Sequence, residues 1–302
     1  FSDFVIFQVV KCVFLIFRIK YEILGNPMVS IVIANKDHLE DLQRCITSIM
    51  DKSTYDNYEI IVVENNSTSD EIYEYYKKIQ EHANIRVITY EGEFNYSRIN
   101  NLGAAQAQGE YILLLNNDTK VITLDWIEEL LMYAQRKDVG AVGAKLYYED
   151  KTIQHAGVVL GLGAHRTAGH SHYRVSSNNL GYMGRLCYAQ NVMAVTGACL
   201  MMKKALFTEL GGLDESFAVS LNDVDLCVRA WKAGYVNVFT PFAELYHFES
   251  ISRGLDNTGE KAARYDRESE AFRTKWKEVL ETGDPYYNVN FSLDRSDFAL
   301  KI

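Results

Sequence analysis

Three residues of this chain, Asp118, Asp223 and His247, stand in sequence surroundings that suit chemistry. Asp118 ends the run Asn116-Asn117-Asp118, which directly follows a wholly apolar stretch. A carboxylate in that position suits a hard divalent cation held by one or two carboxylates and completed by the phosphates of a substrate. The same run is equally compatible with an Asx turn that ends a strand. Spacing alone does not decide between the two interpretations.

Asp223 and Asp225 lie at the start of an expected helix over 222–233. Residues two apart on a helix point to different sides, so these two carboxylates do not share one role. At the helix start Asp223 can project into a cleft, and Asp225 can pair with Arg229 four residues later. The simpler interpretation is that carboxylates favour a helix N-terminus, and from spacing alone it is preferred for both.

Histidines invite a metal interpretation in two places. His247 follows Tyr246 in a polar segment, where a lone histidine is more often structural than a ligand. A second group of four histidines lies between residues 155 and 172, but neither a nearby cysteine nor a regular ligand spacing supports a zinc site there. We expect a mobile glycine-rich loop over 157–172 that closes over a ligand. The four histidines in and beside that stretch are His155, His165, His170 and His172.

The composition excludes several classes of protein. The 302 residues include 31 Lys and Arg against 40 Asp and Glu, a net charge of −9, so we expect no nucleic-acid partner. Hydrophobic residues make up 48% and charged residues 24%, which is typical of a folded globular chain. The five cysteines are odd in number and form no CxxC, which indicates the reduced thiols of a cytosolic protein.

From Pro27 onward, apolar strands alternate with amphipathic helices, which predicts an α/β fold with a parallel sheet covered by helices. Ligands of such sheets bind at the carboxyl ends of the strands, where Glu64, Asn65 and Asp118 would fall. Thr68 with Glu71 predicts a capping box at the start of one helix. Strands are expected over 28–34, 58–64, 85–90, 110–115, 139–148 and 198–203, and further helices over 38–50, 100–108, 222–233 and 264–280.

Residues 1–26 are expected to form a separate apolar segment ahead of one continuous domain over 27–302. The run 4–17 has 14 residues interrupted by Gln8 and Lys11, whereas a membrane-spanning helix needs about 20. Aromatic and basic residues together predict an interfacial helix, or a segment packed on a neighbouring domain. We therefore expect a cytoplasmic protein, with peripheral contact at the inner face of the membrane as an alternative to the domain contact.

Six segments of the chain resemble, in order, the successive motifs of family 2 glycosyltransferases and span about residues 28–254. They are VSIVIANKDHLEDLQRCITSI, YEIIVVENNS, NNLGAAQAQGEYILLLNND, GACLMMKK, GGLDESFAVSLNDVDLCVRAWKAGY and YHFESISRG. The chain is most similar to bacterial rhamnosyl-, galactosyl- and glucosyltransferases that build surface polysaccharides or extend protein-linked glycans. The resemblance implies a GT-A fold: a Rossmann-like, mostly parallel sheet flanked by helices, with a continuous acceptor-side half.

The resemblance also implies a donor site. The acidic end of the second strand contacts the base and ribose in this family, which corresponds to Glu64 and Asn65. The DxD motif, which binds the metal and the diphosphate, corresponds to Asn116, Asn117 and Asp118. Asn replaces the first Asp of that motif, so Asp118 is its one anionic ligand.

The resemblance implies a catalytic base at Asp223 and a second metal ligand at His247. Asn222 stands where the family has Glu before the catalytic Asp. The expected reaction is inverting, non-processive transfer from a UDP-sugar, or dTDP-rhamnose, to a hydroxyl of a glycan, glycolipid or glycoprotein with Mn²⁺ or Mg²⁺. No QxxRW motif of the processive synthases is present.

Two alternatives to a glycosyltransferase remain. A sugar-1-phosphate nucleotidyltransferase would need a GxGxR-type loop after the first strand, where this chain has Asn35-Lys36-Asp37. A non-catalytic carbohydrate-binding or scaffold domain would be compatible with the Asn residues at 116 and 222. A dinucleotide dehydrogenase and a P-loop enzyme are disfavoured because neither GxGxxG after the first strand nor GxxxxGK[ST] occurs.

Overall fold

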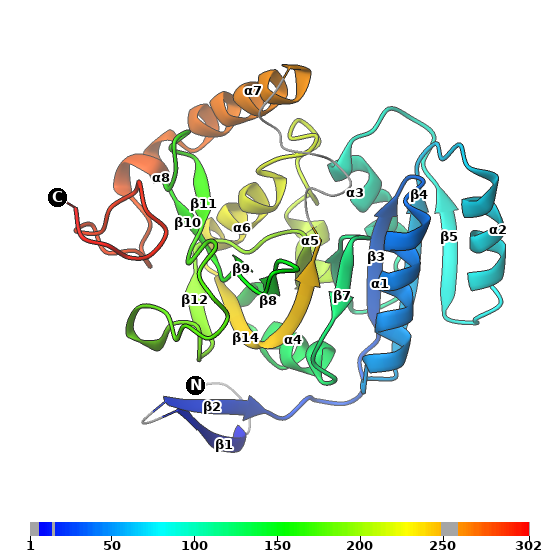
Figure 1. The fold of residues 1–302 in the computed structure, drawn as a ribbon, viewed down its shortest axis with the longest axis horizontal. Helices are drawn as coiled ribbons and strands as arrows, with labels where there is room; N and C mark the ends of the chain where they lie inside the picture. The colour runs from blue at the N-terminus through cyan, green and yellow to red at the C-terminus, as the bar shows by residue number, and fades with distance from the viewer. Residues whose placement is uncertain (1–5, 14–15, 249–258, 302) are drawn as a thin grey trace.

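The computed structural model describes residues 6–13, 16–248 and 259–301, and its centre is one mixed β-sheet (Figure 1). The strands run in the order β12-β14-β8-β13-β6-β3-β4-β5, with β7 paired to β14 and β9 paired to β8. Helices α1, α2 and α4 pack on one face, and α3, α5, α6 and α7 on the other. This arrangement is the α/β fold predicted from the alternating pattern.

The first half of the sheet is parallel and follows the predicted elements closely. Its strands are β3 (Val29–Asn35), β4 (Tyr58–Glu64), β5 (Ile85–Thr89) and β6 (Tyr111–Leu115). Its helices are α1 (Leu39–Lys52), α2 (Asp70–Ile79) and α3 (Tyr96–Gln106). A Cβ on Gly103 of α3 would lie 2.3 Å from Cγ1 of Val32. The small residues of α3 therefore let this helix lie directly against β3.

The start of α2 differs from the predicted capping box. The N-cap position is Ser69 rather than Thr68, and its side chain makes no capping hydrogen bond. The carboxylate of Asp37 instead accepts hydrogen bonds from the backbone N–H of Thr68 at 2.7 Å and of Ser69 at 3.1 Å. An acidic residue from the β3–α1 loop thus satisfies donors at this helix start.

The second half of the sheet is mixed. Strand β13 (Cys199–Lys203) runs antiparallel to both β6 and β8 (Val139–Tyr147), and β14 (Val236–His247) runs parallel to β8. The short strands are β7 (Thr119–Val121), β9 (Ile153–His155) and β12 (Gln190–Val192). The helices are α4 (Trp126–Ala134), α5 (Lys204–Glu209), α6 (Asn222–Lys232), α7 (Gly259–Lys275) and α8 (Lys277–Thr282). The single terminal helix expected over 264–280 is therefore two helices, which meet at Trp276.

The glycine-rich stretch is not the loop that was expected. Strands β10 (Val158–Leu160) and β11 (Ala168–His170) form an antiparallel hairpin within it, and a short 3₁₀ helix, η1 (Tyr182–Gly184), follows.

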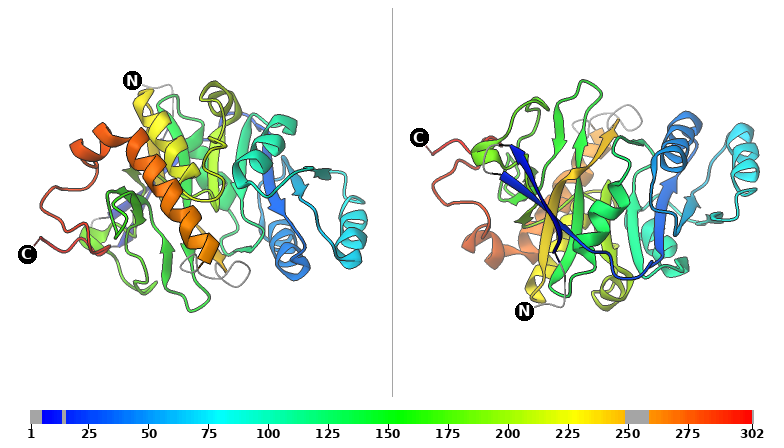
Figure 2. Two further views of the ribbon diagram at one scale, coloured as in Figure 1. Left: turned by 90° about the horizontal axis from the view of Figure 1, so that it is seen from above. Right: turned by 90° about the horizontal axis from the view of Figure 1, so that it is seen from below.

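Helix α7 crosses over α6 on the same side of the molecule (Figure 2). Trp276 Nε1 donates to Asp225 Oδ1 at 2.9 Å, which ties the α7–α8 junction to α6.

The N-terminal segment is a β-hairpin, so the predicted interfacial helix is wrong. Strand β1 (Ile6–Val13) pairs antiparallel with β2 (Ile16–Tyr21), and the hairpin crosses beneath the main sheet (Figure 2). Lys20 Nζ lies 3.0 Å from Asp125 Oδ2, and Arg18 pairs with Glu129 of α4. These ion pairs join the hairpin to the α4 side of the domain.

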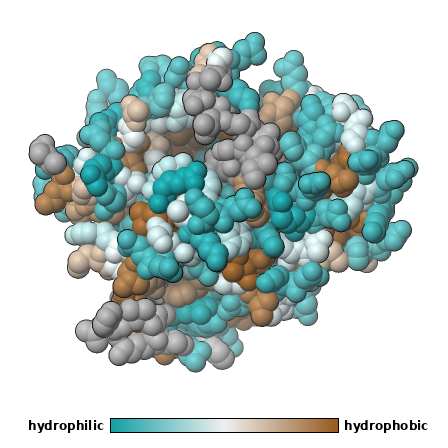
Figure 3. All heavy atoms as spheres, in the orientation of Figure 1, coloured by the Kyte–Doolittle hydropathy of each residue, from teal (hydrophilic) through white to brown (hydrophobic). Residues whose placement is uncertain are grey.

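In the part of the chain that the structure describes, no helix is both long and apolar enough to cross a membrane. The face seen in Figure 3 is mainly hydrophilic, with small hydrophobic patches between polar side chains. The apolar side chains of the central sheet are buried in two clusters, one on each of its faces.

Candidate active site

Two pockets adjoin one another at the carboxyl ends of β3 and β6. The first has a volume of about 390 Å³ and the second about 310 Å³. Tyr96, Asn116 and Val219 line both, so the two pockets share a wall. The site therefore lies where ligands of α/β sheets bind, at the ends of the central strands.

Asp118 and His247 meet between these pockets because of a strand pairing. Strand β14 runs antiparallel to β7, with His247 opposite Thr119, and the backbone N–H of Phe248 donates to the carbonyl of Asp118 at 2.9 Å. As a result, His247 Nε2 lies 3.2 Å from Asp118 Oδ1. Both side chains are buried, at 5% and 9% exposure. The sheet itself thus brings a carboxylate and an imidazole to one point.

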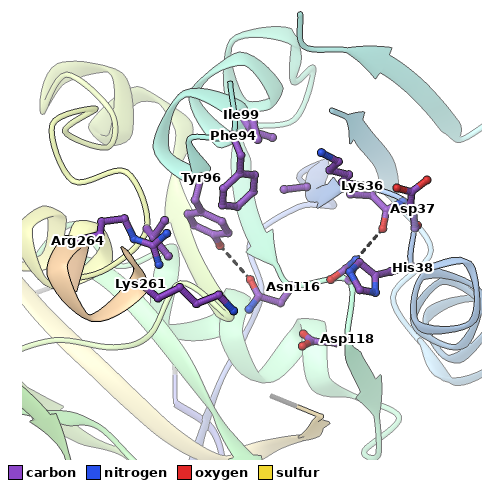
Figure 4. Close-up of a pocket in the computed structure, with 14 residues that line it drawn as sticks. Lys36, Asp37, His38, Phe94, Tyr96, Ile99, Asn116, Asp118, Lys261 and Arg264 are labelled. Atoms are coloured by element: carbon purple, nitrogen blue, oxygen red, sulfur yellow. Dashed lines mark hydrogen bonds between the residues drawn. The ribbon is translucent and has the colours of Figure 1, made fainter. Parts of the chain in front are cut away.

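Asn116 connects this pair to the second pocket. Its Nδ2 lies 3.2 Å from His247 Nε2, and its Oδ1 lies 3.1 Å from the hydroxyl of Tyr96. The same hydroxyl donates to the carbonyl of Gly197 at 3.0 Å. Figure 4 shows Tyr96 and Asn116 side by side, with Asp118 beyond Asn116. The Asn that replaces the first Asp of the family motif is therefore part of a continuous polar network.

Asp223 stands at the first turn of α6 and lines the second pocket. Its Oδ2 accepts a hydrogen bond from the backbone N–H of Gly197 at 2.7 Å, and its Oδ1 accepts one from the N–H of Val224 at 2.7 Å. A Cβ on Gly197 would lie 3.4 Å from Cβ of Asp223 and 3.3 Å from the hydroxyl of Tyr96. Gly197 thus permits the close approach that fixes the carboxylate.

Asn222 is buried within the turn that precedes α6. Its Oδ1 accepts from the backbone N–H of Asp223 at 2.8 Å, and its Nδ2 lies 3.3 Å from the carbonyl of Val219. A glutamate in its place would have no N–H to donate to that carbonyl. Asn222 therefore holds the segment that presents Asp223.

Glu268 of α7 braces the same segment, and the sequence analysis missed it. Its carboxylate accepts from three successive backbone N–H groups, those of Ala218 at 3.0 Å, Val219 at 3.3 Å and Ser220 at 2.7 Å. Val219 lines both pockets. A glutamate in the middle of a helix gives no sequence signal that it binds a distant loop.

Glu64 and Asn65, the predicted base and ribose contacts, are buried and line neither pocket. Glu64 accepts from the backbone N–H of Ser67 at 2.7 Å and from the hydroxyl of Tyr76 at 2.8 Å. Asn65 Nδ2 donates to the carbonyl of Gly92 at 3.0 Å. Both side chains hold the loop that follows β4, beside the first pocket rather than in it.

The first pocket carries positive side chains that were not among the predicted site residues. Asp118 lies on one side of it, and Lys261 and Arg264 of α7 lie on the other (Figure 4). Lys261 extends toward Asn116, and Phe94 and Tyr96 lie next to each other on the same wall (Figure 4). The sequence offered no signal for this pair, because Lys261 precedes the helix expected over 264–280, whereas α7 begins at Gly259. Lys36, Asp37 and His38 of the β3–α1 loop line the side opposite Lys261 and Arg264 (Figure 4).

The donor set at Asp118 and His247 suits a divalent cation that keeps open positions. Among the residues the structure describes, no group of three or more His, Cys, Asp or Glu side chains is arranged to hold a metal ion. Carboxylate oxygen and neutral imidazole are ligands of Mn²⁺, and the remaining positions would be left to substrate oxygens. Cys45 is buried nearby, with its Sγ 3.4 Å from the hydroxyl oxygen of Thr119, and burial raises its thiol pKa to about 12.

Comparisons with known proteins bear on the family and the fold of the chain. The model of glycosyl transferase family 2 matches residues 30–211. The chain is 46% identical to protein y4gI of Sinorhizobium fredii and 37% identical to the O-antigen biosynthesis protein RfbC of Myxococcus xanthus. Both alignments cover 94% of the present chain. It spans 31% and 22% of those two relatives.

Two solved structures share the fold. GalNAc-T7 with UDP, GalNAc and Mn²⁺ has a TM-score of 0.67 over 85% of this chain and 50% of its own, at 15% identity. The mannosyltransferase PcManGT of Pyrobaculum calidifontis, with GDP-Man and Mn²⁺, has a TM-score of 0.59 over 85% of this chain and 69% of its own, also at 15% identity. The predicted GT-A architecture is confirmed by these likenesses, which at this identity concern the fold.

Proposed function

Because the chain belongs to glycosyltransferase family 2, we propose that it transfers a sugar from a nucleotide-diphosphate donor to a hydroxyl of a glycan or glycoconjugate acceptor. One observation carries the proposal. Asp118, His247 and Asp223, which are far apart in the sequence, line two pockets that share Tyr96 and Asn116. The name of the Myxococcus relative, an O-antigen biosynthesis protein, supports a surface polysaccharide as the acceptor class.

We assign the first pocket to the donor. Lys261 and Arg264 line it, so a diphosphate there would lie beside two positive side chains. Phe94, which is 43% exposed, offers an aromatic face for a nucleobase. UDP and dTDP are the proposed nucleotides. The contact of Glu64 and Asn65 with base and ribose stays a prediction, and their hydrogen bonds support a role in shaping the neighbouring loop.

Asp118 and His247 are the proposed ligands of Mn²⁺ or Mg²⁺. A divalent cation held there would neutralise the charge that develops on the departing nucleoside diphosphate. Asn116 and Asn117 lie beside this point, and their amide groups are suited to hydrogen bonds with phosphate oxygens.

Asp223 is the proposed general base. Backbone N–H groups hold both of its oxygens, so the carboxylate faces the second pocket in a fixed orientation. As the acceptor oxygen forms its bond to the anomeric carbon, the bond from that carbon to the diphosphate breaks and Asp223 takes the hydroxyl proton. A single displacement of this kind inverts the anomeric centre. General base catalysis of this type contributes about 10² to 10⁴ in rate.

A panel of UDP-, dTDP- and GDP-sugars with Mn²⁺ tests the proposal. Nucleoside diphosphate release is measured without acceptor, and calorimetry measures binding of the free nucleotides. We expect slow hydrolysis of at least one donor and binding of its nucleotide. The absence of nucleotide binding across the panel would favour a scaffold domain, and would contradict the proposed function.

A further inference from the structure

A buried carboxylate outside the proposed catalytic group holds the irregular segment that leads into α6. Glu268 of α7 is only 5% exposed. Its Oε1 accepts from the backbone N–H of Ala218 and of Val219, and its Oε2 accepts from that of Ser220 at 2.7 Å. None of these three N–H groups donates to a backbone carbonyl among the residues that the structure describes. Successive backbone N–H groups around one carboxylate form an anion-binding concavity, so α7 supplies the hydrogen bonds that a strand or helix would otherwise supply.

The carbonyl side of the same segment is fixed by the start of α3. The backbone N–H of Tyr96 donates to the carbonyl of Ala218 at 2.7 Å, and the hydroxyl of Ser97 donates to the carbonyl of Phe217 at 2.6 Å. Helices α3 and α7 therefore hold the segment from its two sides. Val219, which lines both pockets, is fixed in their shared wall as a result.

The residue after this segment has a strained backbone. Leu221 has a φ of +64°, in the left-handed region, and its side chain is buried. A leucine adopts that conformation only where the surrounding structure imposes it. Leu221 lies between Ser220, which is bonded to Glu268, and Asn222, the first residue of α6. Without the bonds to Glu268, Leu221 could relax to a common conformation and change the direction in which the chain enters α6.

A continuous series of hydrogen bonds leads from Glu268 to Asp223. Val219 donates its N–H to Glu268, and its carbonyl accepts from Asn222 Nδ2 at 3.3 Å. Asn222 Oδ1 accepts from the backbone N–H of Asp223 at 2.8 Å. Asp223 Oδ2 in turn accepts from the N–H of Gly197 at 2.7 Å. The position of the proposed base therefore depends on where the segment 218–220 is held.

We propose that Glu268 is a positioning residue for sugar transfer. It holds the N–H groups of 218–220, keeps Leu221 in its left-handed conformation and so presents Asp223 to the acceptor hydroxyl. This inference rests on the proposed function and deepens it by adding a residue that acts through the base. Glu268 itself lines neither of the two pockets.

Glu268→Gln tests the proposal in the full chain. The amide keeps the size of the side chain but replaces one acceptor oxygen with an NH₂ group that would face a backbone N–H. Transfer is assayed with p-nitrophenyl hexopyranosides as acceptor probes and the nucleotide sugar that the protein hydrolyses fastest. We expect kcat for transfer to fall about 10- to 100-fold, the cost of displacing a reacting group by about 1 Å, while donor KM changes by less than about threefold.

Glu270→Gln is the matched control. It makes the same substitution two residues later on α7, where Glu270 is exposed and pairs with Arg273. Its kcat and donor KM should equal those of the wild type. A wild-type kcat in Glu268→Gln as well would overturn the inference.

A double-variant cycle separates positioning of Asp223 from a general loss of structure. Two residues that act as one unit are non-additive, so in the Asp223→Asn background Glu268→Gln should lower the residual kcat by less than about twofold further. Urea unfolding of each variant measures the accompanying change in stability. Equal losses of kcat in both backgrounds would show that Glu268 does not act through Asp223, and would overturn the inference.

Glu268→Asp carries the same test if the Gln variant does not fold. It keeps the negative charge, but its side chain is one methylene shorter and cannot span all three N–H groups. We expect a smaller loss of kcat that again disappears in the Asp223→Asn background, and a loss that persists there would overturn the inference. Near-normal turnover in Asp223→Asn alone would instead contradict the proposed function, and the inference with it.

Discussion

His247 Nε2 lies 3.2 Å from Asp118 Oδ1, and the pairing of β7 with β14 is what brings them together. Asp118 immediately precedes β7, and His247 is the last residue of β14. The register of one short strand pair therefore sets the distance between two proposed metal ligands. Any ion at this point would be held by the sheet rather than by a flexible loop.

Removing either ligand should weaken binding of Mn²⁺. We expect Asp118→Asn and His247→Ala each to lower Mn²⁺ affinity in the presence of UDP by at least about tenfold, since even outer-shell changes at metal sites cost roughly 10- to 100-fold. Electron paramagnetic resonance of free Mn²⁺ measures the effect. Cys45→Ala is the matched control near the same site and should bind normally. Normal Mn²⁺ affinity in both ligand variants would contradict the assignment.

Cysteine reactivity should follow burial. Burial raises the thiol pKa of Cys45 and Cys227 to about 12, so these thiols stay protonated and inaccessible at pH 8. Cys187 is only partly buried. We expect iodoacetamide to modify Cys187 well before the other two in the folded protein, as measured by peptide mass spectrometry. Equal labelling of all three cysteines would show that the two buried thiols are more accessible in solution than they are in this structure.

Asp284 should make the folded protein less stable as the pH rises from about 4 to 6. Burial raises its pKa to about 6, above the value of about 3.9 in an unfolded chain. The folded state therefore holds a proton that the unfolded state has already released, and stability falls through this window. A shift of about two units corresponds to roughly 3 kcal/mol at most.

The measurement compares the free energy of unfolding of the wild type and Asp284→Asn between pH 4 and 7. The free energy of unfolding of the variant should increase relative to that of the wild type as the pH rises. The difference between the two should become constant above about pH 7. A constant difference across the range would show that Asp284 ionises normally. The backbone N–H of Leu160 donates to this carboxylate at 2.9 Å. The difference in stability between variant and wild type at low pH therefore measures any change in that hydrogen bond, separately from ionisation.

Gly103→Ala should destabilise the packing of α3 on β3. The added Cβ would lie 2.3 Å from Val32 Cγ1, and overpacking of this kind costs about 1–3 kcal/mol. Val32→Ala removes the clashing methyl groups, so the double variant should show a favourable coupling in a thermodynamic cycle. Additive losses in urea unfolding would contradict the direct contact.

How far the sequence predicts this structure depends on whether a signal is local. The strand predicted over 58–64 matches β4 because its apolar residues form one continuous buried run. The start of α2 was misplaced because the acceptor for its N–H groups is Asp37, from a loop in another part of the chain. The N-terminal hairpin was missed because a short apolar run does not distinguish helix from strand by periodicity.

The site shows the same division. Asp223 and Asp118 were identified from family motifs, whereas Glu268 acts on a segment about fifty residues earlier and leaves no trace in local spacing. The histidine pair was visible only as a cluster in the sequence. The structure brings the rings of His155 and His170 together, with their Nδ1 atoms 2.9 Å apart.

The most direct test of the account is the Asp223→Asn variant, assayed for sugar transfer and, separately, for binding of the nucleotide with Mn²⁺. The amide retains the shape of the side chain but cannot take the acceptor proton. The account predicts that kcat for transfer falls by about 10² to 10⁴ while the Kd for the nucleotide stays within about twofold of the wild type. Near-normal turnover in this variant would contradict the role of Asp223 and the mechanism built on it.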